Sequence, residues 1–131
     1  EALRDYGRYL GVAYQLIDDA LDYAGSHDDL GKNVGDDFRE GKMTLPVVYA
    51  VARTRDEEKS FWRRVIAEGR QADGDFEQAL DLMTRDSAIT DTIACARKYT
   101  DRALNELRNA PDSEYADALG DLVTTSLSRI A

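Results

Sequence analysis

The sequence is poor in residues that cross-link chains or ligate soft metals, with one cysteine, one histidine and two prolines among 131 residues. A single cysteine excludes an internal disulfide, and one histidine without a second His or Cys nearby gives no support to a zinc site. No apolar run approaches the roughly 18 residues of a membrane span, so none is predicted. Cys95 lies within a helical pattern, and we expect a buried thiol in a cytoplasmic protein.

Basic residues are also scarce, with 17 Lys and Arg against 26 Asp and Glu and a formal net charge of −9. Nucleic acids and anionic membranes bind clustered Lys and Arg, so neither is an expected partner. An acidic protein also repels an anionic substrate unless a cation lies between them. With 43% hydrophobic and 33% charged residues, the chain fits one globular unit.

Hydrophobic residues recur at three- and four-residue steps over most of the chain, without the alternation typical of strands. The pattern predicts helices over roughly 2–24, 44–54, 56–67, 76–85, 88–109 and 113–130. Pro46 fits the first turn of its helix, where its missing N–H has no helical partner. Trp62 is expected in the core, and Asp75 with Gln78 resembles a capping box.

Three aspartates lie close together in the second half of the first predicted helix. Asp18 and Asp22 share a face with Gln15 one turn earlier, whereas Asp19 points about 100° round the helix. Like charges at this spacing destabilise an isolated helix by about 0.2–0.5 kcal/mol, and a bridging divalent cation would reverse that effect. Mg²⁺ suits such oxygen ligands because it takes one or two carboxylates and shares its other positions with water and phosphate. The alternative is a solvated acidic face.

Residues 23–42 form a glycine-rich segment that we expect to be a functional loop. It carries Lys32 and Lys42, whose compact positive charges suit phosphate groups. Asp37 can hold a lysine in position or accept a metal-bound water, whereas Asp36 is expected to be solvated. Together with the aspartates of the preceding helix, the lysines indicate a site for a magnesium-bound diphosphate.

The runs at 14–22, 31–37 and 40–46 resemble, in order, the second aspartate-rich region of the trans-type polyprenyl diphosphate synthases. Tyr14, where many relatives have Phe, is a small departure. The resemblance implies an all-α, isoprenoid synthase-type helical bundle around a central cavity. It implies metal binding by Asp18, Asp19 and Asp22, with Mg²⁺ as the cofactor. It also implies catalytic roles for Asp18, Asp22, Lys32 and Lys42, and substrate contacts from Gln15, Lys32, Asp37 and Lys42.

The resemblance further implies a prenyltransferase that condenses an allylic prenyl diphosphate with isopentenyl diphosphate by magnesium-assisted ionisation, giving a longer all-trans product. Residues 40–46 lean toward the long-chain synthases that make quinone side chains. The family's first aspartate-rich motif and its upstream basic residues have no counterpart here. We therefore interpret residues 1–131 as the C-terminal part of one catalytic domain, inactive by itself, and expect a homodimer when intact.

Two alternatives stay open at this point. A terpene cyclase or squalene-type synthase uses similar acids, although the lysine-bearing segment with its ending at 40–46 speaks against it. A non-catalytic partner subunit of a heteromeric synthase would also keep one acidic motif and lack the other. The residues preceding Glu1 would separate an active synthase from such a partner.

Overall fold

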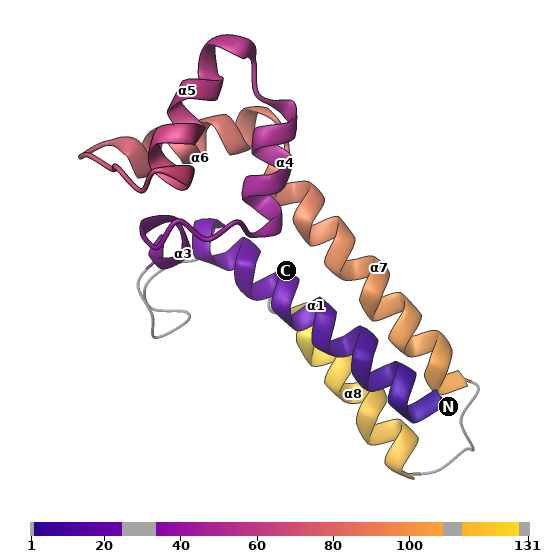
Figure 1. Cartoon of the computed structure of the whole chain (residues 1–131). Coiled ribbons are helices and arrows are strands. Elements are labelled where there is room, and N and C mark those ends of the chain that lie inside the picture. Colours follow the sequence, from indigo (N-terminus) through magenta and orange to yellow (C-terminus); the bar gives the residue numbers. More distant parts are fainter. Residues whose placement is uncertain (1, 25–33, 109–113, 129–131) are drawn as a thin grey trace. The chain divides into compact units, whose positions relative to one another are not determined.

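The computed structural model describes residues 2–24, 34–108 and 114–128. Its helices are α1 (Ala2–Ala24), α3 (Asp36–Arg39), α4 (Leu45–Arg53), α5 (Lys59–Trp62), α6 (Asp75–Arg85), α7 (Ala88–Arg108) and α8 (Glu114–Ser128), with the 3₁₀ helix η1 (Asp56–Glu58) and the π-helix η2 (Arg63–Ala67) (Figure 1). No strand occurs in these residues, so the predicted all-α class is confirmed. None of the described helices combines the length and apolar character needed to cross a membrane.

The chain divides into two compact units, Glu1–Ile17 with Ile93–Ala131 and Asp18–Thr92. In the first unit, α1 contributes Tyr6 and Leu10 to a small core that Ala103 of α7 completes. The Tyr9 and Tyr99 rings add an aromatic contact with centroids 6.3 Å apart. The apolar stripe predicted along the first helix therefore packs on a second long helix, as amphipathic helices do.

The second unit contains the larger core. Helices α4 and α6 pack against each other within it. Its buried residues are Tyr23, Phe38, Val47, Ala50, Phe61, Trp62, Val65, Ala79, Leu82, Met83 and Ala88. Trp62 is buried, as predicted. Burial of these side chains holds the short helices in place, because helices of four or five residues are not stable by themselves.

The observed helix boundaries agree closely with the predicted ones where the apolar repeat extends over many residues. The helix predicted over 2–24 is α1, and Pro46 lies in the first turn of α4. The segment predicted as one helix over 56–67 instead passes through 3₁₀, α and π geometry. Such changes depend on local hydrogen bonding, and the apolar period does not report them.

Three other expectations differ from the structure. The segment expected to be a loop contains the short helix α3, which Phe38 anchors in the core. The capping box predicted at Asp75 is wrong: Gly74 is the N-cap residue of α6, and the Asp75 carboxylate instead accepts hydrogen bonds from Arg64 and the Ala72 N–H. Cys95 was expected to be buried, but its side chain is only partly covered on α7.

Candidate functional site

Asp22 joins the end of α1 to the start of α3. Its carbonyl accepts the Gly35 N–H at 2.8 Å, and its Oδ2 atom accepts the Asp37 N–H at 3.1 Å. The side chain is completely buried. An aspartate of the acidic motif therefore fixes the backbone of the segment that carries Asp37.

Lys42 lies beside two carboxylates of the same segment. Its Nζ atom is 3.6 Å from Oδ1 of Asp37 and 3.1 Å from Oε2 of Glu40, and its N–H donates to the Asp37 carbonyl at 2.9 Å. Glu40 first, and then Asp37, raises the pKa of Lys42. Because the side chain is 57% exposed, the ammonium group stays charged and accessible to a ligand.

Tyr23 places a neutral phenol next to these acids. Its ring stacks on Phe76 with centroids 6.0 Å apart. Burial, followed by the charges of Asp22 and Asp37, raises the pKa of the Tyr23 hydroxyl, while its contact with the Thr44 hydroxyl lowers it. The phenol is therefore uncharged at neutral pH. Neither Tyr23 nor Thr44 was among the predicted site residues, although Tyr23 directly follows the run at 14–22 and Thr44 lies in the run at 40–46.

The three aspartates in the second half of α1 differ in exposure. Asp22 is fully buried, Asp19 is nearly so, and Asp18 is partly exposed. Gln15 has an exposed side chain. Asp18 and Asp22 share a helix face by spacing, yet Asp18 is the aspartate most accessible to a ligand. Lys32, which was predicted to grip phosphate, lies outside the described residues.

Asp36 and Asp37 are adjacent in sequence but have different surroundings. Asp36 is 41% exposed and pairs with Arg39 at 2.6 Å, whereas the Asp37 side chain is only 14% exposed and faces Lys42. Such a short-range exposed pair contributes little to stability. Asp36 is thus the solvated member of the two.

The acids do not form a closed metal cage. No three His, Cys, Asp or Glu side chains within residues 2–24, 34–108 and 114–128 are grouped so that they could together hold a metal ion. Mg²⁺ commonly takes only one or two protein carboxylates and completes its shell with water and substrate phosphate. The partly exposed Asp18 fits that shared kind of site and does not fit a structural metal.

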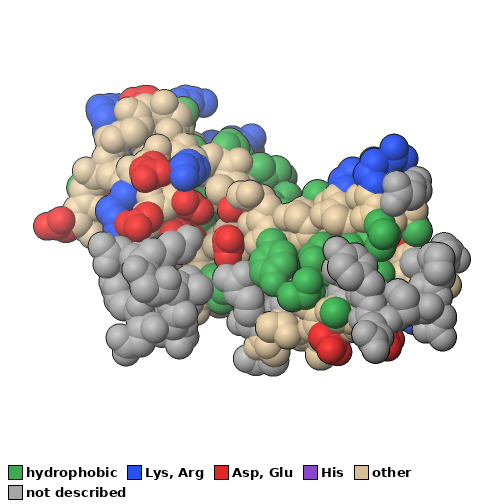
Figure 2. Space-filling model, turned by 90° about the horizontal axis from the view of Figure 1, so that it is seen from below, with side chains coloured by type: hydrophobic (Ala, Val, Ile, Leu, Met, Phe, Trp, Pro, Cys, Tyr) green, Lys and Arg blue, Asp and Glu red, His purple; other side chains and the backbone are tan. Residues whose placement is uncertain are grey.

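Charges of both signs reach the surface near one another. On the face drawn in Figure 2, several acidic side chains gather with basic side chains between them. Among the described residues, the carboxylates in the second half of α1 and in α3 outnumber the two cations near them, Arg39 and Lys42. An anionic ligand would therefore meet net repulsion here unless a cation accompanied it.

Known proteins with similar sequences include several long-chain polyprenyl diphosphate synthases. Octaprenyl diphosphate synthase of Haemophilus influenzae is 38% identical over 129 residues, which are 98% of this chain and 39% of that protein. An all-trans-nonaprenyl-diphosphate synthase of Rhodobacter capsulatus is 40% identical over 130 residues, again with 39% of its length covered. The chain thus spans about two fifths of the length of these relatives.

Solved structures agree with this result. A polyprenyl synthase from Caulobacter crescentus, complexed with calcium and isoprenyl diphosphate, superposes with a TM-score of 0.91 at 46% identity, over 100% of this chain and 40% of that one. A decaprenyl diphosphate synthase from Rhodobacter capsulatus superposes with the same TM-score at 45% identity, over 99% of this chain and 40% of that one.

The sequence also matches the family described as polyprenyl synthetase over residues 1–83. The matched range includes α1 with Asp18, Asp19 and Asp22, α3 and Lys42. Because this range covers more than half of the chain, the protein belongs to the polyprenyl synthetase family.

Proposed function

We propose that this chain forms part of a prenyltransferase that condenses an allylic diphosphate with isopentenyl diphosphate into a longer all-trans polyprenyl diphosphate. The relatives named above make octaprenyl, nonaprenyl and decaprenyl diphosphates, which supports a long-chain product. We further propose that residues 1–131 are the C-terminal part of one catalytic domain and act with a region that supplies the first acidic motif. Assembly as a homodimer and a cytoplasmic location stay predictions.

The observation that carries this proposal is the connected set of contacts from Asp22 through Asp37 to Lys42. Asp22 holds the Asp37 backbone, and the Asp37 carboxylate lies beside the Lys42 ammonium. A lysine on a flexible stem becomes a useful phosphate ligand when its position is restricted beforehand. Asp22 thus helps to position the Lys42 ammonium, and the aspartate-rich run also offers carboxylates of its own.

The proposed reaction begins with cleavage of the bond between the allylic carbon and the diphosphate oxygen. Negative charge grows on the diphosphate as the bond breaks, and Lys42 stabilises that charge from a fixed position. Lys32, in the same segment of the sequence, has the same proposed role. The buried, uncharged Tyr23 adds no further negative charge next to the departing group. Gln15 is proposed to contact the substrate.

Mg²⁺ is the proposed cofactor. Asp18, Asp19 and Asp22 are its proposed carboxylates, of which one or two would be direct ligands while water and phosphate complete the shell. When bound it would act as a Lewis acid that offsets the diphosphate charge. The carboxylates would hold the metal ion, while Lys42 and Lys32 would contribute positive charge of their own. This division explains how an acidic surface accepts an anionic substrate.

Replacing Asp18 in the complete synthase polypeptide that contains this chain tests the proposal. Asp18→Ala should lower turnover by about 10²-fold or more and raise the Mg²⁺ concentration needed for half-maximal rate, because a carboxylate on the metal is lost. Asp36→Ala is the matched control, since Asp36 pairs only with Arg39 in the described contacts. Equal and mild effects of the two variants would show that the acids form a solvated face.

A second pair of variants tests the lysine. Lys42→Met should weaken binding of geranyl diphosphate, measured by calorimetry with Mg²⁺ present. Lys59→Met is the control, because Lys59 is 60% exposed and also pairs with an acid, Asp56, at 2.9 Å. An equal loss of affinity in both variants would show that Lys42 acts only through the general charge of the surface.

A further inference from the structure

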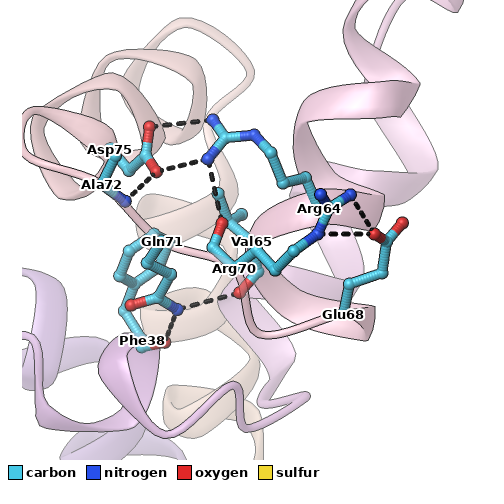
Figure 3. Close-up of polar contacts among 8 residues, drawn as sticks. All are labelled: Phe38, Arg64, Val65, Glu68, Arg70, Gln71, Ala72 and Asp75. Atoms are coloured by element: carbon cyan, nitrogen blue, oxygen red, sulfur yellow. Dashed lines mark hydrogen bonds and ion pairs between the residues drawn. The ribbon is translucent and has the colours of Figure 1, made fainter.

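Gln71 connects the segment that carries Asp37 and Lys42 to the π-helix η2. Its Nε2 group donates to the Phe38 carbonyl at 2.7 Å and to the Val65 carbonyl at 2.8 Å (Figure 3). Both amide hydrogens are therefore used. Phe38 belongs to α3, so one side chain ties α3 to an element far away in sequence.

The turn that presents Gln71 is itself held at both ends. Arg64 makes two hydrogen bonds with the Asp75 carboxylate at 2.8 and 3.0 Å, and it donates to the Arg70 carbonyl at 2.9 Å. The Ala72 N–H donates to Asp75 at 2.7 Å. Figure 3 shows these bonds enclosing the turn on both sides of Gln71. The amide therefore approaches α3 from a supported position.

Helix α3 depends on contacts from outside itself to stay in place. It contains four residues, too few for a stable isolated helix. Asp22 binds it at the Asp37 N–H, and Phe38 buries its side chain in the core. Gln71 binds the carbonyl of the next residue, Phe38. The backbone of Asp37 and Phe38 is thus held by Asp22 of α1 and by Gln71, which lies in the segment 68–74 between η2 and α6.

We propose that Gln71 is a positioning residue for the diphosphate site, holding the backbone from which Asp37 and Lys42 project. The inference rests on the proposed function, because it assigns Lys42 to the substrate. Gln71 belongs to none of the runs that carry the family resemblance. It acts on the substrate only through α3, so its loss changes where the Lys42 ammonium lies and leaves the charge of the site unaltered.

The test is Gln71→Met in the complete synthase, since methionine keeps the length of the side chain and removes both donors. Gln71 makes one hydrogen bond to α3 and one to η2, and the link between the two elements needs both. We therefore expect affinity for geranyl diphosphate with Mg²⁺ to fall about tenfold, equivalent to about 1.4 kcal/mol. Gln78→Met, an exposed change on α6, should leave affinity unchanged.

Two further measurements separate positioning from simple loss of stability. Amide hydrogen exchange at Lys42, whose N–H binds the Asp37 carbonyl, should become about tenfold faster in Gln71→Met without ligand. In a Lys42→Met background, Gln71→Met should reduce affinity by less than about twofold, because coupled residues are not additive. Unchanged exchange, or the full tenfold loss repeated in the double variant, would overturn the inference. If Lys42→Met alone leaves affinity intact while exchange still rises, the proposed function fails and the support of α3 by Gln71 stands.

Discussion

Gly35→Ala is the most informative single change, because Gly35 occupies the junction between α1 and α3. Its φ angle is +90°, and a Cβ atom built there would lie 2.8 Å from Cε1 of Phe76. The Phe76 ring is itself confined, since it contacts Tyr23 on one side and Phe38 on another, with centroids 6.0 and 5.7 Å away. The added methyl therefore cannot be accommodated by a simple turn of a flexible side chain.

The expected cost has two parts. A left-handed backbone costs an alanine about 1–2 kcal/mol relative to glycine. Forcing a methyl group into a packed aromatic contact costs about 1–3 kcal/mol more. Reduced freedom of the unfolded chain returns about 0.4–1 kcal/mol. We therefore expect Gly35→Ala to lower the free energy of unfolding by about 2–4 kcal/mol.

Gly74→Ala provides a closely matched control. Gly74 is also the N-cap residue of a helix, with φ of +87°, but a Cβ atom there would meet nothing within 4 Å. Only the backbone cost applies, so we expect a loss of about 1 kcal/mol. Urea denaturation of both variants, followed by circular dichroism, measures the difference. Losses equal within about 0.5 kcal/mol would refute the close approach of Gly35 to Phe76.

Other variants test the electrostatics and the core. Arg64→Met should lower the unfolding midpoint at neutral pH, and less so as pH falls through the Asp75 pKa, which Arg64 depresses; scans at several pH values check this. A neighbouring arginine lowers the pKa of Glu58 from 4.5 to about 2. The ionised carboxylate therefore stabilises the fold above pH 4.5, and this contribution is lost as the pH falls toward 2. Glu58→Gln should make the free energy of unfolding depend less on pH in this acidic range. Calorimetry should show a loss of about 2–5 kcal/mol for buried Met83→Ala, against about 0.5 or less for exposed Met43→Ala.

The long helices and the acid-lysine pattern were predictable from the sequence. An apolar period sustained over 2–24 leaves little choice but α1, and Pro46 marks the start of α4 because proline fits only the first turn. The family resemblance rests on residues that lie close together along the chain. All of these signals are local, so they need no knowledge of the tertiary contacts.

The rest depends on contacts between distant residues. Nothing local shows that Asp22 accepts the Asp37 N–H, or that this bond helps to order α3. The amide of Gln71 finds its acceptor on Phe38, 33 residues away, so its role appears only in the folded chain. Asp75 has the local signature of a capping box, but the bidentate bond to Arg64 is available only after folding and replaces it.

Calorimetry of geranyl diphosphate binding to the complete synthase, performed with Mg²⁺ and again with EDTA, tests the central claim most directly. The carboxylates around Lys42 repel an anion, so binding should be strong with the cation and should fall by at least about 10²-fold without it. The same affinity in both conditions would contradict the account, because the acidic residues would then have no cation to hold.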